Sequence, residues 1–227
     1  MSGATDGREA VIFKIRKALG TSDSAPRRSA IAERLGTPPP PLVPERAKRD
    51  KDQLRGLFRQ FLEGQSATVV EAASAAEVPA AIAGFLRSAN LPLRVRVGGD
   101  AYLEKLAWGS EPALERRKGP AEGDDEVGLS HATAAVAETG TLVLASGADN
   151  PVTLSYLPET HIVVVEDKDL VGGYEGAWEK IRARFGKRAM PRTVNFVSGP
   201  SRTADIGGQL VMGAHGPRRL CVILVRG

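Results

Sequence analysis

The chain has 227 residues, of which 42% are hydrophobic and 26% are charged, an ordinary composition for a globular protein. This composition supports a buried core and excludes a wholly disordered chain. The length fits one domain with an appendage, or two small domains.

The net charge is +4, but it is unevenly distributed. Residues 1–60 hold 13 Lys and Arg against 7 Asp and Glu, whereas the rest of the chain holds 18 against 20. A basic N-terminal segment suits an acidic partner protein. Nucleic acid is disfavoured, because the segment has no interleaved aromatic side chains for base stacking.

The chain has a single cysteine, Cys221, inside the apolar run 220–225. One thiol cannot form an internal disulfide or hold an iron–sulfur cluster, which normally needs four thiolates. We therefore expect Cys221 to be a buried strand residue, in a chain that binds no cofactor by itself. No apolar run approaches the roughly 20 residues that span a bilayer. The start of the chain has no signal-type apolar region, so we expect a cytoplasmic protein.

The N-terminal part is predicted to be a helix followed by a linker. Apolar residues recur at helical spacing over residues 8–19, and Gly20 is a plausible helix stop. Residues 21–44 hold six of the 15 prolines, which is typical of a linker or an extended arm. The sequence therefore predicts residues 1–44 as an N-terminal helix with a proline-rich basic linker, and residues 45–227 as an α/β domain.

Helical and strand patterns then alternate along the chain. Helices are predicted at 46–63, 77–89, 101–108 and 174–185, whereas 109–125 is polar and rich in turns. Strands are predicted at 67–71, 94–97, 142–145, 162–165, 193–197 and 221–225. The last strands are almost continuously apolar, as in strands buried on both faces of a parallel or mixed sheet. This pattern predicts a layered, open α/β sheet with flanking helices, preceded by an N-terminal helical arm.

The segment from Ser198 to Asp205 directly follows a predicted strand, where ligands bind in open α/β sheets. Gly199 lets the backbone approach a ligand, and the hydroxyls of Ser201 and Thr203 and nearby peptide N–H groups suit an anion. Arg202 can grip a carboxylate or phosphate with two hydrogen bonds. A helix opening at residues 203–205 would add a favourable dipole. The alternative is a tight strand-to-helix turn in which Arg202 pairs with Asp205.

Two further residues are candidates for acid–base chemistry. His215 is flanked by glycines and is next to two arginines, so it can reach a ligand as an acid, a base or a hydrogen-bond donor. The alternative is a loop histidine bonded to backbone. Glu138 is the only carboxylate in a stretch of small and apolar residues, flanked by Thr139 and Thr141. Burial would raise its pKa and make it an acid, base or acyl acceptor. The alternative is a carboxylate that fixes a turn by accepting backbone hydrogen bonds. The three histidines lack zinc-site spacing, so no metal site is expected.

These segments resemble the lactate utilization protein C family, with its LUD domain. The resemblance rests on the order and spacing of four strings, which are Ala137-Glu138-Thr139-Gly140-Thr141-Leu142-Val143, Leu157-Pro158-Glu159-Thr160-His161-Ile162-Val163, Ser198-Gly199-Pro200-Ser201-Arg202-Thr203-Ala204-Asp205-Ile206 and Gly213-Ala214-His215-Gly216-Pro217-Arg218. It is specific over residues 128–225 and looser over 8–110. The sequence departs from many relatives at Gly207-Gly208, where they have an acidic residue after Ile206, which weakens the argument for a helix start.

The resemblance implies a fold similar to that of glucosamine-6-phosphate deaminases, ribose-5-phosphate isomerases and CoA transferases. It also implies a protein that acts with two companion proteins carrying iron–sulfur clusters, which together oxidise L-lactate to pyruvate. The family supplies no established catalytic residue. The site candidates are therefore our own: Glu138 and His215 as catalytic residues, Ser198, Gly199, Ser201, Arg202 and Thr203 as the anion-binding group, and Thr139, Thr141 and Asp205 in support.

Three hypotheses follow from the sequence. The first is an accessory subunit of a lactate-oxidising iron–sulfur assembly, whose Arg202 loop binds a small carboxylate, a cofactor phosphate or a structural anion. The second is a stand-alone enzyme of the sugar-phosphate isomerase or CoA transferase type, with Glu138 as acid, base or nucleophile. The third is a regulatory or docking module whose basic arm, residues 1–44, binds an acidic surface.

Overall fold

The computed structural model describes residues 4–20, 24–37, 40–186, 189–206 and 208–226, and leaves undescribed the side chains of residues 4–6, 205 and 206. Its internal contacts divide the chain into two units, Met1–Leu42 and Val43–Gly227. The division falls close to the predicted boundary between residues 44 and 45. Each unit is described by itself below.

The first unit contains two helices, α1 (Ala4–Ala18) and α2 (Ala25–Gly36). Helix α1 was predicted, although it begins earlier than expected. Helix α2 lies in the segment predicted as a linker or extended arm, so that prediction was wrong over residues 25–36. The physical reason is the position of the prolines. Pro26 lies in the first turn of α2, where proline favours a helix, and residues 38–41 follow its end.

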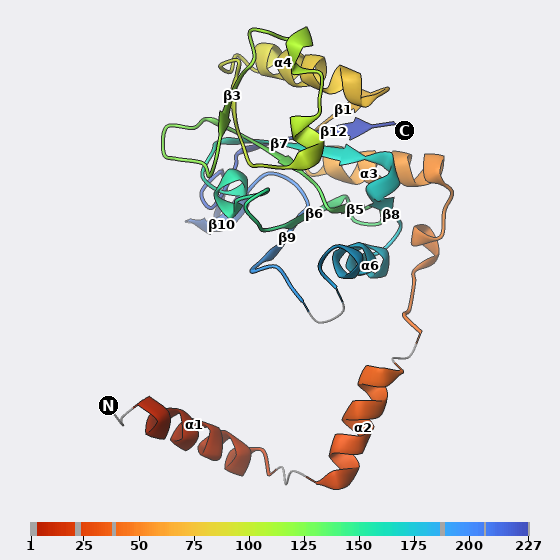
Figure 1. Cartoon of the computed structure of the whole chain (residues 1–227), viewed down its shortest axis with the longest axis vertical. Coiled ribbons are helices and arrows are strands. Elements are labelled where there is room, and N and C mark those ends of the chain that lie inside the picture. Colours follow the sequence, from red (N-terminus) through yellow and green to blue (C-terminus); the bar gives the residue numbers. More distant parts are fainter. Residues whose placement is uncertain (1–3, 21–23, 38–39, 187–188, 207, 227) are drawn as a thin grey trace. The chain divides into compact units, whose positions relative to one another are not determined.

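The second unit is built on a six-stranded, wholly parallel sheet (Figure 1). In spatial order its strands are β1 (Thr68–Ala72), β12 (Arg219–Val225), β7 (Thr160–Glu166), β4 (Val127–His131), β2 (Arg94–Val97) and β3 (Glu115–Lys118). The central strands β12 and β7 are buried on both faces, as their apolar sequences predicted.

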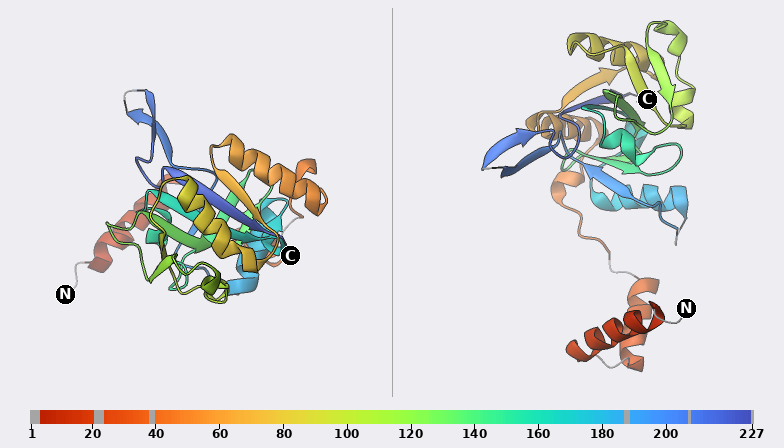
Figure 2. Two further views of the ribbon diagram at one scale, coloured as in Figure 1. Left: turned by 90° about the horizontal axis from the view of Figure 1, so that it is seen from above. Right: turned by 90° about the vertical axis from the view of Figure 1, so that its left-hand side faces the viewer.

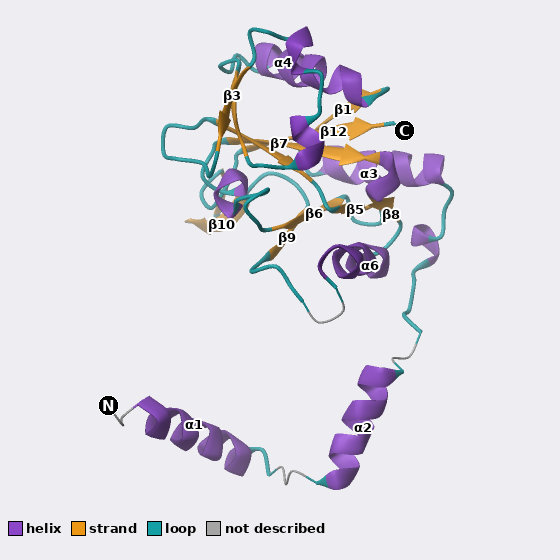
Figure 3. Cartoon of the chain, in the orientation of Figure 1, coloured by secondary structure: helices purple, strands orange, loops and turns teal. Residues whose placement is uncertain are grey.

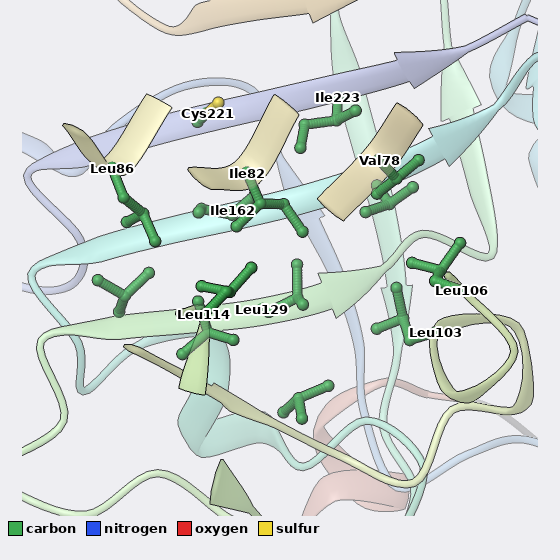
Figure 4. Packing of buried hydrophobic residues seen from close by; sticks show 14 of the residues in the cluster. Val78, Ile82, Leu86, Leu103, Leu106, Leu114, Leu129, Ile162, Cys221 and Ile223 are labelled. Carbon is green, nitrogen blue, oxygen red and sulfur yellow. The ribbon is translucent and has the colours of Figure 1, made fainter. Parts of the chain in front are cut away.

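Helix α4 (Val78–Ser88) covers one face of this sheet. Its buried side chains Val78, Ile82 and Leu86 pack on alternate residues of the central strands, including Ile162 and Ile223 (Figure 4). The next residues of the same strands point to the opposite face, because successive side chains of a strand alternate. The short helix α5 (Ala101–Glu104) adds Leu103 to this core.

The opposite face is covered by helix α3 (Lys51–Gly64) and by a second sheet. The second sheet has the order β8 (Leu170–Val171), β5 (Ala134–Val136), β6 (Thr141–Ala145) and β9 (Val194–Val197). Helix α6 (Tyr174–Phe185) packs on the far side of that sheet. Helices therefore flank the strands as separate layers (Figure 3). Short 3-10 helices connect elements at Glu45–Ala47, Ala75–Glu77, Trp108–Ser110, Val152–Ser155 and Asp167–Asp169.

The fold is mixed α/β with a mostly parallel central sheet and flanking helices, as predicted. The apolar runs at 142–145 and 193–197, however, belong to the second sheet and pair antiparallel with each other. The segment 109–125, predicted as polar turns, contains the edge strand β3. The helix predicted over 46–63 begins only at Lys51, because the Asp50 carboxylate caps it by accepting a 2.8 Å hydrogen bond from the Gln53 amide.

The helix predicted to open at Thr203 is absent. Residues 202–206 form strand β10 (Arg202–Ile206), which pairs antiparallel with β11 (Gln209–Met212) in a two-stranded ribbon. The ribbon projects from the body of the second unit (Figure 2). This excludes the helix dipole that was expected to help bind an anion beside Arg202.

The structure also bears on two expectations, the burial of Cys221 and the lack of a membrane-spanning segment. Cys221 is a free, fully buried thiol in β12, as predicted, and burial raises its pKa to about 12. Among the helices of the described residues, none combines the length and the apolar character needed to cross a bilayer.

Candidate functional site

The turn that carries Glu138 joins β5 to β6 and packs against helix α3. Gly140 has a φ of +62°, a left-handed conformation that glycine adopts readily. A Cβ atom at this position would lie 2.7 Å from the Cβ of Phe61. Glycine is therefore required both for the shape of the turn and for its close approach to α3.

The Glu138 side chain is buried and is paired with an arginine. Glu138 is 5% exposed, and its Oε2 lies 3.3 Å from the Arg46 Nε. This oxygen accepts no hydrogen bond from the residues that the structure describes. The Glu138 amide donates a 3.1 Å hydrogen bond to the Gly172 carbonyl, which fixes the turn from the backbone side. The carboxylate thus faces a cation that sequence analysis did not single out.

Four hydroxyl groups meet beside this turn. The Thr141 hydroxyl lies 2.8 Å from that of Thr139, 2.6 Å from that of Ser198 and 3.1 Å from that of Tyr174. Thr139 and Tyr174 are also 3.1 Å apart. Thr141 is fully buried and Ser198 is exposed, so the cluster leads from the core to the surface. The sequence grouped these threonines and the serine as candidates, and the structure brings them together.

The loop after β9 places Arg202 next to a neutral partner. Gly199 has a φ of +140°, and a Cβ there would lie 2.9 Å from the Cβ of Gln65 at the end of α3. The exposed Arg202 guanidinium donates a hydrogen bond to the Gln65 side-chain carbonyl. Thr203 is buried. The Asp205 side chain lies outside the described residues, so its predicted pairing with Arg202 stays a prediction.

Ser201 connects this loop with the segment of His215. The Ser201 amide donates to the Pro217 carbonyl at 2.8 Å, and its carbonyl accepts from the Gly213 amide at 2.9 Å. The Ser201 hydroxyl accepts a 3.3 Å hydrogen bond from the His215 amide, and the residue at 215 is exposed. The imidazole of His215 is thus free to face solvent beside the loop.

A cavity of about 350 Å³ lies next to His215. It is lined by Tyr156, Leu157, Pro158, Glu159, Met212, Gly213, Ala214, His215, Gly216 and Arg218. The Glu159 carboxylate lies 3.6 Å from Arg218 and 3.9 Å from Arg219, and these three side chains are about half exposed or more. The cavity can therefore present both the His215 imidazole and the Arg218 guanidinium to a small anion.

The four sequence strings thus contact one another, through Thr141 and Ser198, through Ser201 and the His215 amide, and through Gly216 and Tyr156. We call this group of segments the motif face. It consists of residues 137–141, 156–159, 198–203 and 212–218. Two of these segments directly precede β7 and β12, so the motif face lies at the amino edge of the parallel sheet. The expected position was the carboxyl edge, where open α/β sheets usually bind ligands. The expectation failed because β9, which precedes the loop, belongs to the second sheet.

Glu138 and His215, the two predicted catalytic residues, have different neighbours. Glu138 contacts Arg46 and lies beside Gly173, whereas His215 contacts Ser201. Among the contacts of the described residues, none joins the two side chains. The motif face therefore has a hydroxyl-rich part near Thr141 and a cationic part near His215.

Sequence analysis missed Arg46, Gln65, Tyr156 and Tyr174, which complete the motif face. The Tyr156 hydroxyl donates a 3.2 Å hydrogen bond to the Asn195 side-chain oxygen. Tyr174 begins α6 and Gln65 follows α3, so both lie at helix ends. The residues that they contact are determined by tertiary packing and not by a sequence pattern. The position of Tyr156 next to the Leu157-Pro158-Glu159 string was the one available signal.

Comparison with known proteins shows the family of this chain. The family model of the LUD domain matches residues 103–225, a span that contains the whole motif face except its contacts in and before α3. The chain is 37% identical over 100 residues to lactate utilization protein C of Shouchella clausii, covering 44% of each chain. It is 32% identical over 147 residues to an uncharacterized protein of Neisseria meningitidis, covering 62% of this chain and 61% of that one.

A solved structure has the same fold. The crystal structure of a DUF162 family protein from Deinococcus radiodurans superposes with a TM-score of 0.57 and 27% identity, covering 78% of this chain and 99% of that one.

The fold and the motif face therefore define a LUD-type α/β protein. The chain belongs to the LUD domain family. It spans about half the length of the curated relatives that it matches. The expected likeness to sugar-phosphate isomerases and CoA transferases stays a prediction.

Proposed function

We propose that this chain is a cytoplasmic component of lactate utilization that binds a small carboxylate at the motif face. The observation that carries the proposal is the contact of the four strings with one another beside a cavity lined by His215 and the exposed Arg218. Relatives that are 37% and 39% identical over 100 and 102 residues bear the name lactate utilization protein C. A carboxylate fits the cavity beside His215, because Arg218 and the imidazole can donate hydrogen bonds to its oxygens.

The proposal includes two companion proteins that carry iron–sulfur clusters and oxidise L-lactate to pyruvate together with this chain. The single cysteine cannot supply the thiolates for a cluster, so the redox centres belong on the companions. Helix α1 supports a docking role for the first unit. Its side chains Val11, Phe13 and Ile15, and Leu19 directly after it, are between 52% and 67% exposed, which is typical of a surface that binds a partner.

Ligand binding is tested by titrating the full chain with L-lactate and then pyruvate, followed by NMR. We expect shifts at residues 213–218, and an affinity loss of about tenfold or more for Arg218→Ala, equivalent to about 1.4 kcal/mol. Arg192→Ala is the matched control, because Arg192 is an exposed arginine outside the cavity. Equal affinity in both variants contradicts the site.

The role in metabolism is tested by removing the gene and measuring growth on L-lactate. The wild-type chain should restore growth, and the Arg218→Ala variant should restore it poorly. Co-purification with the two iron–sulfur companions should fail when residues 1–42 are deleted. Normal growth without the gene would overturn the proposed role, whatever the binding result.

A second candidate is a stand-alone enzyme in which Glu138 acts as acid, base or nucleophile. The burial of Glu138 next to Arg46 and the hydroxyl cluster favours it, because a buried, positioned carboxylate suits such chemistry. Turnover of a sugar phosphate or a CoA thioester by the isolated chain, lost in Glu138→Gln with the fold intact, would support it. Full turnover in that variant would exclude the role of Glu138.

A further inference from the structure

A second cavity lies at the carboxyl edge of the parallel sheet, away from the motif face. Its volume is about 560 Å³. Its lining includes Asp100, Tyr102, His131, Glu166, Asp169 and Lys180. All of them except Lys180, which lies in α6, are located at or just after the carboxyl ends of β2, β4 and β7, three neighbouring strands. This edge is the usual place for a ligand site in an open α/β sheet.

One ring nitrogen of His131 is held by Asp100. The His131 Nδ1 lies 3.2 Å from the Asp100 Oδ1 and shares a 3.4 Å hydrogen bond with Oδ2. The Asp100 Oδ1 accepts hydrogen bonds of 3.0 Å from the amides of Tyr102 and Leu103. The imidazole stacks on the Tyr102 ring, with centroids 4.5 Å apart. A carboxylate fixed in this way keeps the proton of the neutral imidazole on Nδ1 and leaves a lone pair on Nε2.

That second nitrogen faces a carboxylate oxygen. The His131 Nε2 is buried, has no hydrogen-bond partner among the described residues, and lies 3.5 Å from the Glu166 Oε2. Two atoms with lone pairs repel each other at this distance unless a cation lies between them. Two ligands bound to one tetrahedral metal ion at about 2.1 Å are about 3.4 Å apart, close to the separation observed.

Asp169 completes a group of three ligands. One ligand atom from each of His131, Glu166 and Asp169 lies within 4.8 Å of the other two. We propose that His131, Glu166 and Asp169 bind a first-row divalent metal ion, with Asp100 as the residue that orients the histidine. One imidazole and two carboxylates suit ions such as Zn²⁺, Mn²⁺ or Co²⁺. Three protein ligands beside a cavity leave coordination positions open to a small molecule.

The cavity is lined by acidic and basic side chains together, namely Asp100, Glu166 and Asp169 with Lys105, Lys168, Lys180 and Arg184. Lys168 and Lys180 contact the Glu166 and Asp169 carboxylates at 2.8 Å each, and so compete with a metal ion. Their side chains are 69% and 30% exposed and can turn toward solvent when the ion binds. Removing Lys180 should therefore strengthen metal binding.

Sequence analysis expected no metal site, because the histidines lack the spacing of a zinc motif. The proposed ligands come from β4, from the end of β7 and from the turn after it, so no local pattern contains them. An alternative occupant of the gap is a proton, which would make His131 an imidazolium between Asp100 and Glu166. The test has to separate these two cases. The proposal does not depend on the carboxylate site at the motif face.

The test is titration of the full, metal-free chain with Zn²⁺ and Mn²⁺ by calorimetry, and with Co²⁺ by visible absorption. We expect one ion per chain, and a loss of affinity of tenfold or more, roughly 1.4 kcal/mol, in His131→Ala and Glu166→Gln. Asp100→Asn should reduce affinity by about 10- to 100-fold, the range for residues that orient a metal-bound histidine. Circular dichroism checks that each variant is folded.

Three controls make the result decisive. Lys180→Ala should bind more tightly than the wild type, which a damaged fold cannot produce. Glu179→Gln changes an exposed acid on the same helix as Lys180, and His215→Ala removes a surface histidine elsewhere, so both should bind as the wild type does. Absence of saturable binding of all three ions, or equal binding by His131→Ala, overturns the metal site and favours the imidazolium.

Discussion

Thr141 and Ser198 share a 2.6 Å hydrogen bond between their hydroxyl groups, although 57 positions separate them in the chain. Thr141 begins β6 and Ser198 follows β9, two strands that pair antiparallel. The bond therefore ties the turn of Glu138 to the loop of Arg202. Two family strings that are distant in the sequence form one surface because of this pairing.

Replacing Thr141 by valine should destabilise the fold. Valine keeps the shape but leaves the hydroxyls of Ser198, Thr139 and Tyr174 without their shared partner. We expect a loss of about 1–2 kcal/mol in the free energy of unfolding, measured by urea denaturation. Thr141→Ser retains the hydroxyl and should lose less. A valine variant as stable as the wild type would show that the cluster contributes nothing.

Gly140→Ala should cost stability because of the backbone and the packing together. Its φ is +62°, and the new Cβ would lie 2.7 Å from the Phe61 Cβ. A loss of about 1–3 kcal/mol is expected, as for overpacked sites. Gly84→Ala is the matched control: Gly84 is exposed within α4 and a Cβ there meets nothing within 4 Å. That variant should gain about 0.5–1 kcal/mol. Both changes can be compared by thermal and urea unfolding.

The pair of Arg46 and Glu138 should show coupling in a double-mutant cycle. Arg46→Ala leaves the Glu138 carboxylate buried without a countercharge, which destabilises folded proteins. Because the Arg46 side chain is 55% exposed, solvent screens part of the effect, and we expect about 1–2 kcal/mol. Arg46→Ala should cost clearly less in a Glu138→Gln background. Additive losses in the double variant would show that the two side chains do not interact.

His161 should make the fold sensitive to acid. The imidazole is fully buried in β7, beside the Ser130 hydroxyl at 2.9 Å, and burial lowers its pKa from 6.5 to about 3. Between these values the unfolded chain binds a proton that the folded chain does not. Stability therefore falls as the pH decreases from about 6.5 toward 3, with a limiting slope of about 1.4 kcal/mol per pH unit.

The measurement is urea unfolding of the wild type and of His161→Gln at a series of pH values. The variant lacks the titrating group, so its stability should fall less over this window, even if it is less stable at neutral pH. His215→Ala is a suitable control, since it removes an exposed histidine and should keep the wild-type slope. Equal slopes in the wild type and His161→Gln would contradict the prediction.

The sequence alone determined the elements whose signal is local. The apolar runs of β7 and β12 predicted strands buried on both faces, and helical spacing predicted α3, α4 and α6. These predictions were confirmed because the order of apolar and polar residues directly indicates which positions of a helix or strand are buried. The four family strings could also be recognised, since their residue types and their order are properties of the sequence itself.

Only the tertiary structure decided how strands pair and which side chains meet. Strand β3 was missed because its residues, Glu115–Lys118, are charged and it lies at the sheet edge, where no apolar alternation is needed. Residues 203–205 were predicted to open a helix but belong to strand β10. The pairing of β10 with β11 is made by backbone hydrogen bonds, which the side-chain pattern does not indicate. For the same reason, the sequence could not show that His131 faces Glu166. They belong to neighbouring parallel strands, and only the register of those strands brings them together.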